Sequence, residues 1–122
     1  MTAPVISSVT AEGLVALVDV LAESLPEFAS ARIARPWALA AAAGAVEASI
    51  AGVELHRSPA DAAEAMARTI RRLRPLDHGN DALAFLAATV HLRLAGADAR
   101  PGTVARIAGI TVPAELADRY AD

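Results

Sequence analysis

Apolar residues recur at helical spacing through the central stretch of the chain, from Ser58 to Gly96. The first half carries four apolar residues at intervals of four, four and three, namely Ala62, Met66, Ile70 and Leu73. The second half carries a comparable series, namely Leu83, Leu86, Val90 and Leu94. Residues at these spacings share one face of an α-helix. The pattern therefore predicts two helices, over residues 59–73 and 81–95, each with one buried stripe.

Capping residues mark the ends of these two helices. Ser58 is a suitable N-cap for the first helix, and Pro75 ends it because the residue before a proline is disfavoured in the α region. Asn80 is a suitable N-cap for the second helix, and Gly96 provides a left-handed residue that ends it. Because the loop between the helices is short, we expect them to pack antiparallel as a central pair.

Similar reasoning predicts four further helices, over residues 11–24, 36–52, 103–108 and 113–120. The first of these has a buried stripe of four residues, namely Leu14, Leu17, Val18 and Leu21. In the second, Gly52 ends or bends the helix, and Trp37 near its start is expected to be an anchor at the rim of the core. Glu27 to Arg35 is a linker or a short helical turn. About six helices are therefore expected.

The composition supports an all-α fold. The chain has 122 residues, of which 55 % are apolar but only 3 % aromatic, so alanine and aliphatic residues must build the core. Alternating patterns typical of strands are nearly missing. This length suits a single domain spanning residues 1–122, and we expect a compact helical bundle.

Charge and apolar run lengths indicate a cytoplasmic protein that binds neither DNA nor membranes. The chain has no cysteine, and its N-terminus lacks the pattern of a signal peptide. Its longest apolar run, residues 36–46, is too short to span a membrane. The net charge of −3 argues against non-specific nucleic-acid binding. Residues 103–110 imitate the start of a helix-turn-helix, but Glu115 and Asp118 then occupy positions that should be apolar.

Four arginines cluster at the end of the first central helix, namely Arg68, Arg71, Arg72 and Arg74. One interpretation is favourable placement of cations at a helix C-terminus, with Glu64 one turn before Arg68. The other is a basic rim that receives a phosphate or an acidic partner. The pattern alone leaves both open.

The loop that joins the central helices ends in Gly-Asn at a helix N-terminus, where backbone N–H groups can receive an anion. Its sequence, Arg74-Pro75-Leu76-Asp77-His78-Gly79-Asn80-Asp81-Ala82, resembles a degenerate copy of the Fic/Doc active-site loop, HPFxxGN(K/G)R. The helices before and after the loop are similar too, and residues 8–17 resemble the first helix of the Doc branch. The resemblance extends from about residue 6 to about residue 98 and implies a Fic/Doc-like helical fold.

The departures from the family pattern concern its chemistry. Arg74 stands at the position of the catalytic histidine, and Asp81 and Ala82 stand where the family has residues that contact nucleotide phosphates. Leu76 replaces the family's aromatic residue, and His78 its usual acidic residue. The residues that shape the loop are kept, namely Pro75, Gly79 and Asn80.

The resemblance therefore implies a protein with a degenerate active-site loop and no catalytic residue. An arginine side chain stays protonated at neutral pH and cannot take a proton from a hydroxyl. Asp81 is stabilised at a helix N-terminus but repels a phosphate there. The favoured hypothesis is a non-catalytic binding protein or toxin–antitoxin-like component. The alternative is an active transferase that moves a nucleotidyl or phosphoryl group from a nucleotide to a protein hydroxyl.

Ligand expectations follow from these two hypotheses. The binding protein needs no cofactor, whereas the transferase would use ATP or another nucleotide with Mg. Asp77, His78 and Asp81 do not make a metal site, because adjacent side chains diverge and a structural zinc needs four ligands. Possible anion-binding positions are seven residues of the loop, namely Arg74, Pro75, Asp77, His78, Gly79, Asn80 and Asp81. By family analogy, the expected partner is a protein, either an antitoxin-like segment or a regulated protein.

Overall fold

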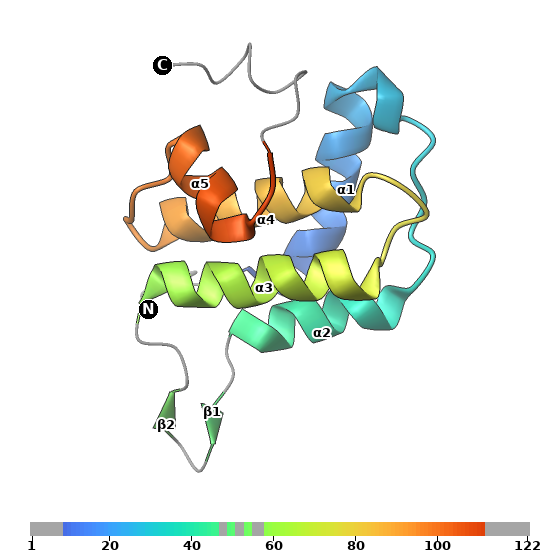
Figure 1. The fold of residues 1–122 in the computed structure, drawn as a ribbon. Coiled ribbons are helices and arrows are strands. Elements are labelled where there is room, and N and C mark those ends of the chain that lie inside the picture. The colour runs from blue at the N-terminus through green and yellow to red at the C-terminus, as the bar shows by residue number, and fades with distance from the viewer. Residues whose placement is uncertain (1–8, 47–48, 51–52, 55–57, 112–122) are drawn as a thin grey trace, which may run out of the picture.

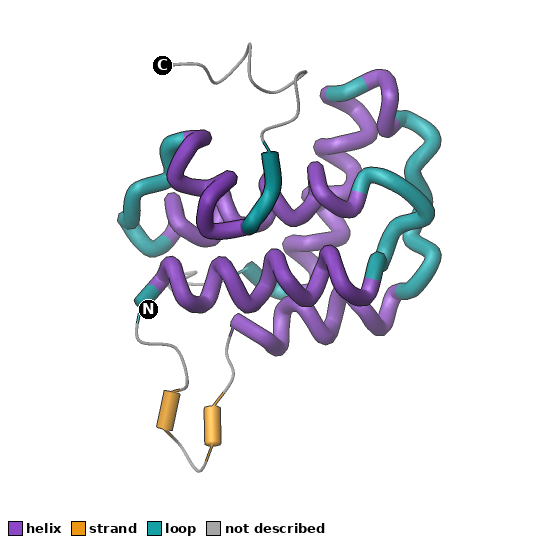
Figure 2. Tube along the Cα trace, viewed as in Figure 1, coloured by secondary structure: helices purple, strands orange, loops and turns teal. Residues whose placement is uncertain are grey.

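The computed structural model describes residues 9–46, 49–50, 53–54 and 58–111. These residues form an all-α protein with one small β-hairpin (Figures 1 and 2). The α-helices are α1 (Ala11–Ser24), α2 (Pro36–Val46), α3 (Pro59–Leu73), α4 (Asn80–Leu94) and α5 (Pro101–Ala108). A 3-10 turn, η1 (Pro26–Phe28), follows α1, and the strands β1 (Ser49–Ile50) and β2 (Val53–Glu54) pair antiparallel.

Helix α3 lies at the centre of the fold and packs against α2, α4 and α5. Figure 1 shows α3 running antiparallel to α2 on one side and to α4 on the other, as the short loop after α3 predicted. Four residues of α3 are fully buried, namely Ala63, Met66, Ala67 and Ile70. Alanines on this face let neighbouring helices approach toward the short end of the usual ~8–10 Å axis separation. One hydrophobic core includes residues from all five α-helices.

The predicted ends of α1 and α3 are confirmed, because local capping determines them. The Thr10 hydroxyl accepts a hydrogen bond from Gly13 N–H at 3.0 Å, and the Ser58 hydroxyl accepts one from Asp61 N–H at 3.1 Å. Each side chain satisfies a backbone donor that has no partner within the first turn. The predicted helix over residues 113–120 lies outside the described residues.

The buried face of α4 was predicted correctly at Leu83 but wrongly at the other three residues of the expected stripe. Its fully buried side chains are mostly alanines together with Leu83 and Leu92, whereas Leu86 and Val90 are half-buried and Leu94 is 43 % exposed. Helix α4 contacts α1, α3 and α5, so several of its sides face neighbours. The small residues occupy the closest contacts, and Leu86 and Val90 instead line a groove of about 170 Å³ that α1 also lines. Residue size was therefore a poor guide to burial on this helix.

Helix α2 also differs from its prediction. It ends at Val46 and not near Gly52, and strand β1 lies within the segment predicted to be helical. Trp37 is 59 % exposed and does not anchor the core. Its side chain shares a helical face with Ala41 and Gly44, which are exposed as well, while α2 turns its opposite face to the core.

None of the helices in the described part of the chain has the length and hydropathy needed to span a membrane.

Candidate functional site

The loop between α3 and α4 begins with a reversal of the chain at Arg74. This residue caps α3 in the left-handed conformation, with φ 52°, and its N–H donates to Ile70 O at 2.9 Å. Pro75 follows and is buried. A left-handed cap followed by proline prevents the helix from continuing, which explains why α3 ends where the sequence predicted.

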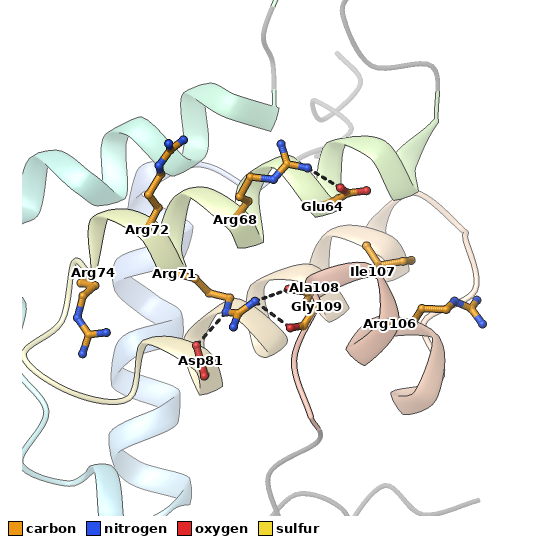
Figure 3. A pocket seen from close by; sticks show the side chains of 10 residues that line it. All are labelled: Glu64, Arg68, Arg71, Arg72, Arg74, Asp81, Arg106, Ile107, Ala108 and Gly109. Carbon is orange, nitrogen blue, oxygen red and sulfur yellow. Dashed lines mark hydrogen bonds and ion pairs between the residues drawn. The ribbon is translucent and has the colours of Figure 1, made fainter.

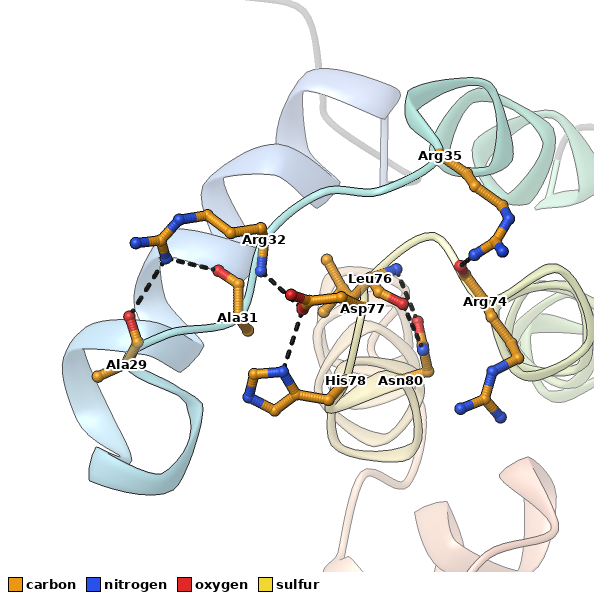
Figure 4. Close-up of polar contacts among 9 residues, drawn as sticks. All are labelled: Ala29, Ala31, Arg32, Arg35, Arg74, Leu76, Asp77, His78 and Asn80. Carbon is orange, nitrogen blue, oxygen red and sulfur yellow. Dashed lines mark hydrogen bonds and ion pairs between the residues drawn. The ribbon is translucent and has the colours of Figure 1, made fainter.

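The connector between α1 and α2, residues 29–35, lies along this loop (Figure 4) and is bonded to it through the backbone. Ile33 and Leu76 form an antiparallel bridge. The N–H groups of Ala34 and Arg35 both donate to Pro75 O, at 2.8 and 2.9 Å. These bonds satisfy backbone groups that a short loop cannot satisfy by itself. The loop is therefore held by a segment about forty residues earlier in the chain.

Side chains strengthen the same contact. Asp77 N–H donates to Arg32 O at 3.0 Å, and Arg32 N–H donates to the Asp77 carboxylate at 2.9 Å. The Arg35 guanidinium donates to Arg74 O at 2.9 Å. The hydrogen bond from Arg32 N–H, helped by the neighbouring His78, lowers the pKa of Asp77 below its ordinary value of 3.8. Asp77 thus has a structural role in joining the loop to the connector.

Asn80 does not cap α4 through its side chain, contrary to the prediction. It is the first residue of the helix, after Gly79, and is only 5 % exposed. Its amide oxygen accepts from Leu76 N–H and its amide nitrogen donates to Leu76 O, both at 2.9 Å. Because both Leu76 groups are buried, this pair of bonds holds the loop closed where no water replaces it.

Gly79 fits a site that other residues cannot occupy without strain. Its φ is +87°, and a Cβ there would lie 2.9 Å from Cδ1 of Phe28. The Phe28 ring also lies beside His78, with the ring centroids 6.2 Å apart. His78 Nδ1 is 3.0 Å from the Asp77 carboxylate. Gly79 and His78 therefore pack against the segment that follows α1.

The other side of the loop faces a cleft between α3, the start of α4 and α5 (Figure 3). The cleft has a volume of about 780 Å³. We call it the arginine cleft; it is lined by Glu64, Arg68, Arg71, Arg72, Arg74, Asp81, Arg106, Ile107, Ala108 and Gly109. Its lining side chains thus include five arginines and two carboxylates.

Arg71 joins the three helices around this cleft. Its Nε lies 3.1 Å from the Asp81 carboxylate at the start of α4. Its terminal nitrogen donates to the carbonyl oxygens of Ala108 and Gly109, at 3.3 and 2.8 Å, at the end of α5. The last carbonyl groups of a helix lack partners within the helix, so a guanidinium there stabilises α5. Arg71 is therefore occupied by structural contacts.

The loop residues predicted as one possible anion site are divided between two sides by the structure. Asp77, His78, Gly79 and Asn80 contact the connector or the loop itself, whereas Arg74 and Asp81 line the arginine cleft. Within the described residues, no group of three or more His, Cys, Asp or Glu side chains is placed to hold a metal ion.

Sequence reasoning missed two contributors to this region. The connector residues Arg32 and Arg35 pair with the loop through long-range backbone contacts, for which the sequence has no local signal. Arg106 joins the arginine cleft from α5, far along the chain from the predicted arginine cluster.

No family model, curated protein or solved structure matches this chain. The Fic/Doc resemblance therefore depends on the motif residues quoted above. The geometry of the loop and of the arginine cleft is independent of that resemblance.

Proposed function

We propose that the chain is a non-catalytic, Fic/Doc-like protein that acts by binding a protein partner. The observation that carries the proposal is Arg74, at the position where the resemblance places the catalytic base. General-base catalysis needs a group that can lose and regain a proton near neutral pH. A guanidinium stays protonated at that pH and cannot accept a proton. Arg74 also lies among other arginines in the cleft, and these give it no basic character.

His78 is poorly placed to replace the missing base. Figure 4 shows its ring directed toward the connector, whereas the Arg74 side chain extends on the other side of the loop. One ring nitrogen lies beside the Asp77 carboxylate, and the ring packs next to Phe28. Use of His78 on the cleft side would require its ring to leave the Asp77 carboxylate and the Phe28 ring.

The first turn of α4 carries no cationic side chain of its own that could position a phosphate. Asp81 is in the first turn and places a carboxylate there, held by Arg71. Ala82 is 2 % exposed, so a long cationic side chain at that position would displace packed atoms. An anion that approached this helix N-terminus would meet the Asp81 charge before the backbone N–H groups.

Radiolabel transfer from nucleoside triphosphates to lysate protein, with Mg present, tests the proposal. We expect no transfer by the wild type and none by Arg74→His, because phosphate contacts at Asp81 and Ala82 are missing as well. The triple variant Arg74→His, Asp81→Lys, Ala82→Arg is the one expected to gain any transfer, and circular dichroism must first show that it is folded.

The alternative function, an active nucleotidyl- or phosphotransferase, predicts the opposite result. Robust transfer by the wild type that persists in Arg74→Ala would refute the non-catalytic proposal and direct attention to His78. A His78→Gln variant would then separate a catalytic histidine from contamination, because only the former loses the signal.

A further inference from the structure

We infer that the arginine cleft binds an extended, acidic segment of a protein partner; this inference names the partner chemistry of the proposed binding function and rests on it. Both carboxylates of the cleft are already paired within the chain. Glu64 pairs with Arg68 along α3, and Asp81 pairs with Arg71. The remaining arginines, Arg72, Arg74 and Arg106, have no ion pair with any residue that the structure describes.

The unpaired arginines are spread along the cleft. Figure 3 shows Arg74 at one end and Arg106 at the other, with the Arg71–Asp81 pair between them. Arg71, in the middle of the cleft, is held by contacts with α4 and α5, whereas the guanidinium groups of Arg74 and Arg106 have no ion pair with the described residues. This spacing suits an elongated ligand with negative charge at both ends more than a compact anion.

The lining also favours a peptide over a polyphosphate. Ile107 is half-buried and gives the α5 side of the cleft an apolar contact. A peptide can place an aliphatic side chain there and carboxylates near Arg74 and Arg106, where guanidinium groups bind carboxylates in bidentate geometry. A nucleotide concentrates its phosphate charge in one place, whereas Arg74 and Arg106 lie at opposite ends of the cleft (Figure 3).

The binding experiment uses a fluorescein-labelled peptide of paired glutamates separated by single leucines. About eight extended residues span roughly 26 Å, similar to the roughly 22 Å length of the 15-residue helix α3. Fluorescence anisotropy of the full chain is measured against this peptide and against an otherwise identical peptide in which glutamine replaces glutamate. Single-stranded DNA and ATP serve as unlabelled competitors.

We expect saturable binding of the glutamate peptide at low salt and weak or no binding of the glutamine peptide. Arg74→Glu and Arg106→Glu should each weaken binding by about five- to tenfold, as expected for loss of a charge-assisted contact with added repulsion. Arg93→Glu is the matched control, because Arg93 is an exposed arginine on α4 outside the arginine cleft, and it should leave affinity within about twofold.

Several results would overturn the inference. These are equal binding of both peptides, equal loss of affinity in Arg93→Glu and Arg74→Glu, or displacement of the peptide by ATP or DNA at lower concentration than by unlabelled peptide. Absence of peptide binding by folded wild type would also overturn it. The transfer assay decides the proposed lack of catalysis separately, so the two failures are distinguishable.

Discussion

Replacement of Asn80 by alanine should destabilise the protein more than any other single polar substitution in the loop. The variant removes the acceptor for Leu76 N–H and the donor for Leu76 O, two buried groups with bonds of 2.9 Å to the Asn80 side chain. Each buried polar group that loses its partner costs about 1–3 kcal/mol, so the loss of both should cost about 2–6 kcal/mol. That is a large part of the ~5–15 kcal/mol that stabilises a typical domain.

Urea denaturation followed by far-ultraviolet circular dichroism measures this loss, because the described protein is mostly helical. Thr89→Ala is the matched control on the same helix. The Thr89 hydroxyl donates to Phe85 O at 2.8 Å, but that oxygen lies within α4 and keeps its backbone partner. We therefore expect Thr89→Ala to cost less than about 1 kcal/mol.

Asn80→Asp separates the two hydrogen bonds. A carboxylate still accepts from Leu76 N–H but faces Leu76 O with no proton to donate. We expect this variant to be destabilised as well, since a charge is added at a position that is only 5 % exposed. If Asn80→Ala costs no more than Thr89→Ala, the side chain of Asn80 does not hold the loop and the account of the closed loop is wrong.

Three further predictions concern the loop, the core and the acid range. Gly79→Ala should destabilise the protein more than Gly96→Ala in thermal melts. Both positions have positive φ, which costs alanine about 1–3 kcal/mol of strain, but only at Gly79 would the added Cβ meet another atom at 2.9 Å. Equal losses of stability would contradict the close contact at Gly79. Leu83→Ala should lower the free energy of unfolding by about 2–5 kcal/mol in urea denaturation, because Leu83 is fully buried. Leu94→Ala should lower it by less than about 0.5 kcal/mol, because Leu94 is 43 % exposed. Similar losses in the two variants would show that α4 is turned differently. The folded pKa of Asp77 is below its ordinary value of 3.8, so the carboxylate stabilises the fold above that pH and this contribution is lost as the pH falls through the lowered pKa. The stability advantage of the wild type over Asp77→Asn should therefore shrink in acid. An advantage that grows in acid would contradict a lowered pKa for Asp77 in the folded protein.

Local signals explain what the sequence predicted well. The hydroxyls of Thr10 and Ser58 each bond to a backbone N–H three residues on, and such contacts need nothing from the rest of the fold. The same kind of local information predicts the all-α fold class and the end of α3 before Pro75. It also predicts the antiparallel packing of α3 and α4. The left-handed stop at Gly96 is also present, with φ +71°.

Tertiary contacts explain what it did not predict. Helix α4 has neighbours on several sides, so its alanines fill the close contacts and Leu86 is left at a groove. The helical pattern of α2 is apolar nearly all round, which leaves no stripe to show that Trp37 faces solvent. The loop could be located from its motif, but not the connector that holds it, because the bridge from Ile33 to Leu76 joins distant parts of the chain.

The two sides of the loop have separate tasks. Leu76 and Asn80, which are buried, determine the shape of the loop, and Gly79 fits only because it lacks a Cβ. Arg74 and Asp81 are exposed and contribute charge to the arginine cleft. Substitutions at surface positions usually change stability by less than about 0.5 kcal/mol, whereas those that leave buried polar groups without partners cost several times more. Charge reversal at Arg74 should therefore change binding without unfolding the loop, whereas replacement of Asn80 should lose the fold of the loop before any effect on binding can be measured.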